Sequence, residues 1–319
     1  MVLVLSFNEY EQCTDPVIDW LLYYKVDFIK LTQKDLYDKS TIQIDIVNNI
    51  FMYRGINLVE KINCIYYRRF EDVLDLPLRK GFPLDQVKFE LKYELKDLIK
   101  YIYYLFKDKI WFPNPNSVSI DKLTALSIAK SCGLHIPSST IINNKNDALN
   151  FISKQETVVT KPIRFSGYFV NGNTTYNMYT NKLQFKELFK WNVIIFFPTL
   201  LQEKITKEFE IRTFYLDGEI YASAIFVDNE NYDDIKRQFS SSNIKWLPFK
   251  FPKEIETKIQ SFMNRISLNT GSIDMIKKIN GDFIFIEVNP VGQFIAPSGR
   301  CNYYLEKKIA NWLKRHDNK

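Results

Sequence analysis

Hydrophobic residues recur along the chain in short alternating runs and in a few longer runs with helical spacing. Residues 2–7 have the apolar pattern of a buried strand, and residues 14–24 have a proline-containing first turn followed by an amphipathic helical pattern. Residues 26–31 form a second strand-like run, so the N-terminus is predicted to be a β-α-β unit. Further along, apolar residues at helical spacing predict a long helix from Leu84 to about Phe106.

Asparagine-glycine and aspartate-glycine pairs mark predicted hairpin turns at residues 171–172, 217–218 and 280–281. These dipeptides accept the positive φ angles of two-residue turns, and each stands between strand-like runs. The register around the second turn places Arg212 opposite Ser223 and Glu210 opposite Ile225. Because side chains alternate along a strand, Glu210 and Arg212 then lie on the same face.

The third turn brings carboxylates together. A two-residue connection at 280–281 places Asp274 directly opposite Glu287 and Ser272 opposite Asn289, so that Asp274, Glu287 and Asn289 share one face. Opposed carboxylates, roughly 5 Å apart at Cβ, repel unless a cation lies between them, and oxygen ligands of this kind suit Mg²⁺. The alternative is that both acids are solvated on an exposed hairpin. The other face is apolar and predicts core: Ile273, Met275, Ile284, Ile286 and Val288.

Composition places the chain among ordinary globular proteins. Its 319 residues are 46% hydrophobic and 25% charged, and the net charge of +6 is dispersed, so the charge does not imply a nucleic-acid partner. Four cysteines without a CxxC pair and two histidines argue against a zinc site or disulfide scaffold and fit a reducing cytoplasm. We expect neither a signal peptide nor a membrane span, because no apolar run approaches roughly 20 residues.

Breaks in the pattern divide the chain into three predicted domains, residues 1–112, 113–199 and 200–319. The proline-broken stretch 111–118 cannot continue a helix and marks the first linker. Asp121 then caps a helix, and a short strand ends in Lys161-Pro162. The next loop contains Ser166-Gly167 and is of the kind that can fold over phosphates. We also expect a helix at 182–190, separate strands at 193–197 and 200–205, and helices at 253–265 and about 302–315.

The predicted elements, in their order along the chain, resemble those of the ATP-grasp superfamily. The resemblance implies an α/β (α+β) fold in which an N-terminal β-α-β pre-ATP-grasp domain precedes two α+β lobes that sandwich ATP. Lys122 matches the first nucleotide-binding lysine of the family, and Lys161 matches the second, which reaches the α- and β-phosphates. Arg212 resembles the arginine that steadies the γ-phosphate and the acyl phosphate during catalysis.

The same resemblance implies the rest of the ATP and Mg²⁺ site. A carboxylate that holds the ribose is implied to be Glu203 or Glu210. Four consecutive residues match the segment whose backbone recognises the adenine edge: Gln202, Glu203, Lys204 and Ile205. Three residues match the D…ExN metal set of the family: Asp274, Glu287 and Asn289.

Within the superfamily, the closer likeness is to maturases of graspetides, which are omega-ester-containing peptides, and in particular to the grasp-with-SPASM type. The phosphate loop departs from many relatives because it has a single glycine, Gly167. The residues that carry the likeness are YYRR at 66–69, the KPI…SG run at 161–167, FEIRTFYLDGEIYASAIF at 209–226, GSIDMI at 271–276, FIEVNPVGQF at 285–294 and CNYYLEKKIANWL at 301–313.

This likeness implies a peptide macrocyclase of the cytoplasm. Asp or Glu side chains of a ribosomal precursor, made of a leader and an acidic and hydroxyl-rich core, would be activated as acyl phosphates. Ser or Thr hydroxyls would then form esters, or Lys amines would form amides, with release of ADP and phosphate. A radical SPASM partner protein and a homodimer are also implied, without nucleic acid or membrane.

Two other functions fit the same residues. One is an ATP-grasp carboxylate-amine ligase that adds an amino acid to a peptide or protein. The other is a nucleotide-gated binding module without turnover. Arg68 and Arg69, which end a strand, are either a solvated terminus or part of a surface for an acidic peptide.

Overall fold

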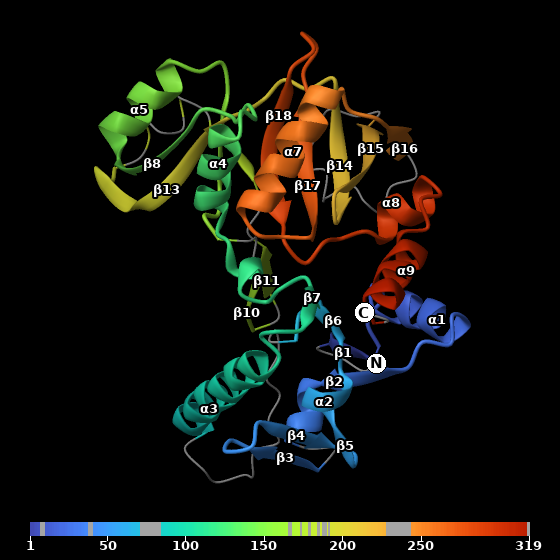
Figure 1. The fold of residues 1–319 in the computed structure, drawn as a ribbon. Coiled ribbons are helices and arrows are strands. Elements are labelled where there is room, and N and C mark those ends of the chain that lie inside the picture. Colours follow the sequence, from blue (N-terminus) through green and yellow to red (C-terminus); the bar gives the residue numbers. More distant parts are fainter. Residues whose placement is uncertain are drawn as a thin grey trace. The chain divides into compact units, whose positions relative to one another are not determined.

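The computed structural model forms two compact units, which are described separately below (Figure 1). The first unit comprises residues 1–119, 268–270 and 290–319, and the second comprises residues 120–267 and 271–289. The structure describes residues 1–6, 10–37, 41–70, 84–164, 168–172, 174–177, 180–183, 186, 190, 192–227 and 244–317. The predicted phosphate loop at Ser166-Gly167 lies outside the described residues.

The first unit is built on a parallel sheet of four strands in the order β2-β1-β6-β7. β1 (Val2–Ser6) is followed by α1 (Asp15–Tyr23) and β2 (Phe28–Thr32), which confirms the predicted β-α-β unit. β6 (Cys64–Arg68) and β7 (Ile110–Phe112) complete the sheet. Because crossover connections cover both faces of a parallel sheet, all five residues of β1 are buried.

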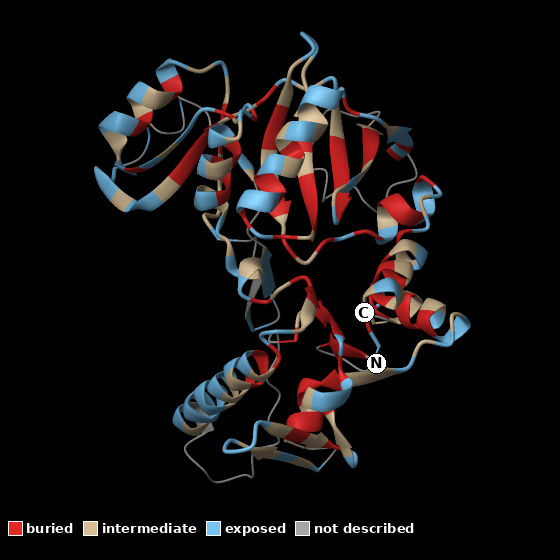
Figure 2. Ribbon diagram, in the orientation of Figure 1, coloured by how far each residue is buried: buried red, intermediate tan, exposed pale blue. Residues whose placement is uncertain are grey.

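Smaller elements surround this sheet. A 3₁₀ turn, η1 (Gln33–Leu36), leads to the antiparallel strands β3 (Ile42–Asp45), β4 (Ile50–Tyr53) and β5 (Ile56–Asn57), and then to α2 (Leu58–Lys61). The predicted long helix is α3 (Leu84–Leu105). Its C-terminal half is packed into the core through Ile99, Ile102 and Tyr103, whereas its N-terminal half is largely exposed (Figure 2).

The end of the chain adds two helices to the first unit. A 3₁₀ turn, η2 (Ser117–Ser119), follows β7. α8 (Ile295–Arg300) was not predicted, whereas α9 (Leu305–Asp317) agrees with the predicted amphipathic helix and packs against α1 and β6. Among the described residues, no helix is long and apolar enough to cross a membrane.

The second unit begins with α4 (Lys122–Ser131), which is capped by Asp121 as predicted. Next come β8 (Ser139–Asn144), α5 (Lys145–Ser153) and β9 (Val158–Lys161). The hairpin β10 (Tyr168–Asn171) and β11 (Thr174–Asn177) confirms the signal at residues 171–172. β12 (Asn181–Leu183) and β13 (Ile195–Glu203) complete an antiparallel sheet in the order β12-β9-β13-β8.

Two predictions in this sheet were wrong. Residues 193–197 and 200–205 were expected to be separate strands, but β13 runs through both because it pairs with β8 on one side and β9 on the other. Residues 181–183 form a strand where a helix was expected to begin, and most of that helix falls outside the described residues.

A second sheet follows in the order β16-β15-β14-β17-β18. Its strands are β14 (Phe209–Leu216), β15 (Glu219–Val227), β16 (Ile244–Phe249), β17 (Thr270–Lys277) and β18 (Phe283–Asn289). α7 (Lys253–Arg265) occupies the predicted residues and lies across one face of this sheet (Figure 1). There Phe262 of α7 contacts Phe285 of β18, with ring centroids 4.9 Å apart.

The β14–β15 hairpin has the predicted register. Arg212 pairs with Ser223 and Glu210 with Ile225. The two turn residues, Asp217 and Gly218, both have positive φ, as a two-residue turn of this kind requires.

The β17–β18 hairpin departs from the prediction at two places. Its turn contains three residues, 279–281, because the Lys278 N–H donates to the Asp282 carbonyl. A bulge then leaves Ile286 without a cross-strand partner, since Met275 pairs with Phe285 and Asp274 with Glu287. Ile286, expected in the core, is only half-buried, and Phe285 takes the buried position.

Candidate functional site

Arg212 and Asp274 form a bidentate ion pair between neighbouring strands. The Arg212 Nε and Nη2 atoms each donate to one Asp274 carboxylate oxygen at 2.8 Å. Only 7% of the arginine side chain and 20% of the aspartate side chain are exposed. Burial alone would lower the pKa of Arg212, but Asp274, together with Glu287 and Glu210, raises it above its usual value. The guanidinium therefore stays charged, with its planar fork matched to the carboxylate.

Glu287 lies opposite Asp274 and is also paired with a cation. The Lys122 Nζ is 3.5 Å from Glu287 Oε2, and the two side chains are only 8% and 11% exposed. Lys122 occupies the first turn of α4, and α4 packs against β18, which brings the lysine to the carboxylate. A lysine this deeply buried is uncommon unless it is paired.

Lys122 also connects this pair to the end of β9. Its Nζ donates to the Pro162 carbonyl at 3.3 Å. Pro162 directly follows Lys161, the last residue of β9, whose side chain is half-buried. The structure thus brings Lys122 to the predicted metal ligand Glu287 and to the backbone directly after Lys161.

Asn289, the third predicted metal ligand, ends β18 opposite Ser272. Its Nδ2 atom is buried and has no hydrogen-bond partner among the described residues. Because the amide nitrogen and oxygen are assigned from hydrogen bonding, this end of the side chain equally offers an oxygen to a cation.

The donor set of the hairpin fits Mg²⁺. Two carboxylates and one amide supply oxygen ligands, and Mg²⁺ usually completes its shell with water and substrate phosphates. Within the described part of the chain, there is no cluster of three or more His, Cys, Asp or Glu side chains that could hold a metal.

The predicted adenine segment ends β13 and is partly engaged by its neighbours. The Glu203 N–H donates to the Ser138 carbonyl at 2.8 Å, and the Lys204 N–H donates to the Thr157 carbonyl at 2.9 Å. Gln202 is buried and its Nε2 donates to Ser139 Oγ at 2.8 Å. These bonds fix the segment, and its last residue, Ile205, is buried.

The two candidate ribose carboxylates, Glu203 and Glu210, have different partners in the structure. The Glu203 carboxylate accepts a hydrogen bond from the Ser138 N–H at 3.2 Å, at the start of β8. Glu210 instead lies on the same face of β14 as Arg212, with its Oε1 2.6 Å from the Lys207 Nζ. Lys207 carries no sequence signal of its own and was missed.

Arg68 is neither solvated nor part of an exposed surface, so both sequence interpretations were wrong for this residue. It is 3% exposed and donates to the carbonyls of Val291 and Gly292. Burial would lower its pKa, but Tyr66, Cys13 and Glu11 raise it above the usual value. A strand-end arginine pair gives no sequence signal that distinguishes this buried role from an exposed one.

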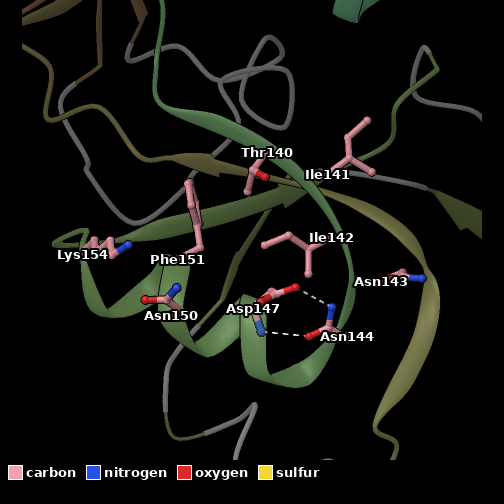
Figure 3. Close-up of a pocket in the computed structure, with 9 residues that line it drawn as sticks. All are labelled: Thr140, Ile141, Ile142, Asn143, Asn144, Asp147, Asn150, Phe151 and Lys154. Atoms are coloured by element: carbon pink, nitrogen blue, oxygen red, sulfur yellow. Dashed lines mark hydrogen bonds between the residues drawn. The ribbon is translucent and has the colours of Figure 1, made fainter.

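A shallow hollow of about 320 Å³ lies between β8 and α5 (Figure 3). Strand residues 140–144 and four α5 residues or their neighbours line it: Asp147, Asn150, Phe151 and Lys154. Asn144 and Asp147 bond to each other here, with the Asp147 N–H donating to Asn144 Oδ1 at 2.9 Å, as an N-cap of α5. None of the predicted ATP or metal residues lines this hollow, so it is separate from the candidate site.

Comparison with known proteins gives structural matches only. No protein-family model matches the chain, and no curated protein matches it in sequence. The macrocyclase MdnC from Microcystis aeruginosa MRC, bound with precursor peptide MdnA, matches with a TM-score of 0.77 at 21% identity, over 98% of this chain and 99% of MdnC.

Two other matches extend over similar lengths. An ATP-grasp ligase associated with a RiPP from Chryseobacterium gregarium, in complex with ADP and a leader and core peptide, has a TM-score of 0.83 at 19% identity, over 98% of this chain and 96% of the ligase. The ATP-grasp ligase PsnB, complexed with a precursor variant, Mg and ADP, has a TM-score of 0.77 at 15% identity, over 99% and 98% of the two chains. The chain therefore has the ATP-grasp fold, in the form found in these peptide-modifying ligases.

Proposed function

We propose that this protein is an ATP-dependent macrocyclase of a ribosomal precursor peptide. The observation that carries the proposal is the cross-strand pair Asp274 and Glu287, each facing a buried cation, at one site of an ATP-grasp fold. Opposed carboxylates beside Arg212 and Lys122 have the charge and ligand chemistry needed for a nucleotide triphosphate and its metal ion.

Each proposed residue has a defined task. Asp274, Glu287 and Asn289 would hold Mg²⁺, which would neutralise the negative charge of the phosphates. Lys122 and Lys161 would contact the phosphates, and Glu210 the ribose. The segment of residues 202–205 would recognise the adenine edge through its backbone.

The chemistry requires alignment and charge neutralisation more than acid-base catalysis. A substrate Asp or Glu carboxylate attacks the γ-phosphorus of ATP, and ADP leaves. Arg212, with its two-point fork, would stabilise the negative charge of the transferring phosphoryl group and of the acyl phosphate. A Ser or Thr hydroxyl, or a Lys amine, then attacks the acyl carbon and phosphate leaves. Each ring therefore loses one water in total and consumes one ATP.

The named ligands of the structural matches support this choice of substrate. MdnC is bound with precursor peptide MdnA, and the Chryseobacterium ligase with ADP and a leader and core peptide. PsnB is complexed with Mg and ADP in addition to its precursor. We therefore assign ATP, Mg²⁺ and a leader-containing acidic precursor to this chain as well.

We further propose a homodimer and a radical SPASM partner in the cytoplasm. The N-terminal half of α3 supports a protein contact, because Phe89 and Tyr93 are 57% and 48% exposed with their rings 4.6 Å apart. Sedimentation of the wild type and of a Phe89→Asp, Tyr93→Asp variant tests the dimer. A monomeric wild type would contradict it. Co-purification with a radical SPASM protein encoded next to this chain tests the partner.

Incubation of candidate precursor peptides with the protein and ATP, followed by mass spectrometry, tests the function. The candidates are short neighbouring reading frames with Thr or Ser and Asp or Glu repeats near their C-termini. Loss of one water per ring supports the macrocyclase. A gain of one amino-acid residue, dependent on free amino acid, would instead identify a carboxylate-amine ligase. Binding of ATP without ADP release with any acidic peptide would indicate a binding module.

A further inference from the structure

The proposed metal ligands are held by two basic side chains. Arg212 forms two 2.8 Å bonds to Asp274, and the Lys122 Nζ lies 3.5 Å from Glu287. All four side chains are largely buried: Arg212 is 7% exposed, Asp274 20%, Lys122 8% and Glu287 11%. Arg212 and Lys122 thus offset the negative charges of Asp274 and Glu287 in a region where water screens charges weakly.

The pairing of both carboxylates with basic side chains opposes the binding of a metal ion without nucleotide. A divalent cation placed between Asp274 and Glu287 would add two positive charges next to Arg212 and Lys122. Because charges of like sign at short range repel strongly where solvent is largely excluded, such a site disfavours the lone ion. A polyphosphate that enters with the ion supplies the negative charge that the two basic side chains need.

We infer that Arg212 and Lys122 are exchangeable counter-ions: they hold Asp274 and Glu287 until metal and nucleotide arrive together, and then move to the phosphates. The inference rests on the proposed function and adds the order in which metal and nucleotide bind. Metal binding depends on nucleotide, so the protein takes up the metal-nucleotide complex and does not bind the metal first.

The surroundings of both cations permit this exchange. Lys122 already shares its Nζ between Glu287 and the Pro162 carbonyl, next to Lys161, and a lysine has three donors on a flexible stem. Arg212 stands on the same face of β14 as Glu210, the proposed ribose ligand, so both face the proposed nucleotide.

Binding of Mn²⁺, followed by electron paramagnetic resonance, tests the inference without turnover. We expect wild-type protein to bind Mn²⁺ at least about tenfold more tightly with the ATP analogue AMPPNP than without it. Arg212→Gln and Lys122→Gln should each raise the affinity for Mn²⁺ alone by about tenfold and weaken binding of the Mn²⁺–AMPPNP complex. Asp274→Asn should lower Mn²⁺ binding in both conditions, which assigns the signal to this site.

A matched control is Lys258→Gln, which removes one positive charge from α7, where Lys258 pairs with Glu254. It should change neither affinity. Equal wild-type affinities for Mn²⁺ with and without AMPPNP would overturn the inference and leave the proposed function standing. Unchanged or weaker binding of Mn²⁺ alone by both Arg212→Gln and Lys122→Gln would also overturn it. Arg212 and Lys122 would then stabilise the carboxylates permanently and would not compete with the metal ion. Absence of Mn²⁺ binding even with AMPPNP would overturn the proposed metal site itself.

Discussion

Asp274 and Glu287 are direct cross-strand partners, although the turn that joins their strands is one residue longer than a two-residue turn. The extra turn residue shifts the pairing by one position, and the bulge at Ile286 shifts it back before the carboxylates. A shift of one residue would have turned one carboxylate to the opposite face of the sheet. The bulge is thus what places both acids on the face of Arg212.

Gly281 makes the longer turn possible, because its φ is +100°. We expect Gly281→Ala to lower the free energy of unfolding by about 1–2 kcal/mol, since a Cβ disfavours this backbone conformation. Gly299→Ala is the matched control: Gly299 lies in α8, and a Cβ there meets nothing within 4 Å. Urea denaturation of both variants measures the difference. Equal stabilities would show that the turn tolerates a side chain.

The carboxylates themselves should control turnover. Asp274→Asn and Glu287→Gln keep the side-chain shape but remove a negative charge, and we expect each to lower kcat at least about tenfold, or about 1.4 kcal/mol, by weakening Mg²⁺ binding. Part of the loss should be recovered at higher Mg²⁺ concentration. Steady-state ADP release at several Mg²⁺ concentrations measures this. Wild-type rates in both variants would exclude these residues as metal ligands.

The two parallel donors of the Arg212 guanidinium should contribute to catalysis in addition to its positive charge. Arg212→Lys retains the positive charge but offers only a point charge in place of two parallel donors. We expect kcat to fall at least about tenfold, with a smaller change in the KM for ATP, because the lost contact forms chiefly during phosphoryl transfer. Arg265→Lys, at an exposed position in the last turn of α7, is the control and should react at the wild-type rate. A fall confined to KM would place Arg212 in ground-state binding only.

The cap of α4 should make stability depend on pH. Asp121 accepts bonds from the Leu123 and Thr124 N–H groups at 2.9 Å, and bonds from Thr124 backbone and side chain lower the pKa of Asp121. Its contribution is therefore present above the unfolded pKa of about 3.9 and is lost as pH falls through the lower folded value. Asp121→Ala should cost about 1 kcal/mol at pH 7.

Asp121→Asn is the control for this titration, because asparagine also caps a helix but does not ionise. Below about pH 4, the wild type should lose stability relative to the asparagine variant. Urea denaturation at pH 7 and in the acid range measures the change. A constant difference between these two proteins across the range would contradict the proposed role of the carboxylate.

The features that could be predicted from the sequence are those set by neighbouring residues, namely turns and the alternation of side chains along strands. The turn pairs Asp217-Gly218 and Asn280-Gly281 located both hairpins, and alternation placed Arg212 and Asp274 on strands. The second register was predicted correctly at the carboxylates although the turn was wrong, because the bulge compensated for the extra residue. Neither the turn length nor the bulge follows from the residue types in this stretch, because the same alternating pattern is compatible with a two-residue and with a three-residue turn.

Contacts between residues far apart in the chain could not be predicted from the hydrophobic and polar pattern. Lys122, one residue after a helix cap, has the local pattern of a solvated lysine, and only the packing of α4 against β18 brings it to Glu287. Arg68 was equally ambiguous, and its burial follows from the loop after β18 that covers it. In both cases the partner lies far away in the chain, where periodicity carries no information.

The ratio of ADP released to water lost from the precursor peptide, measured in one reaction, tests ATP-dependent macrocyclisation most directly. We expect one ADP for every ring closed, as measured by ADP release and by mass spectrometry, with both signals reduced together in Glu287→Gln. ADP release without any loss of water, or ring closure that proceeds without ATP, would contradict it.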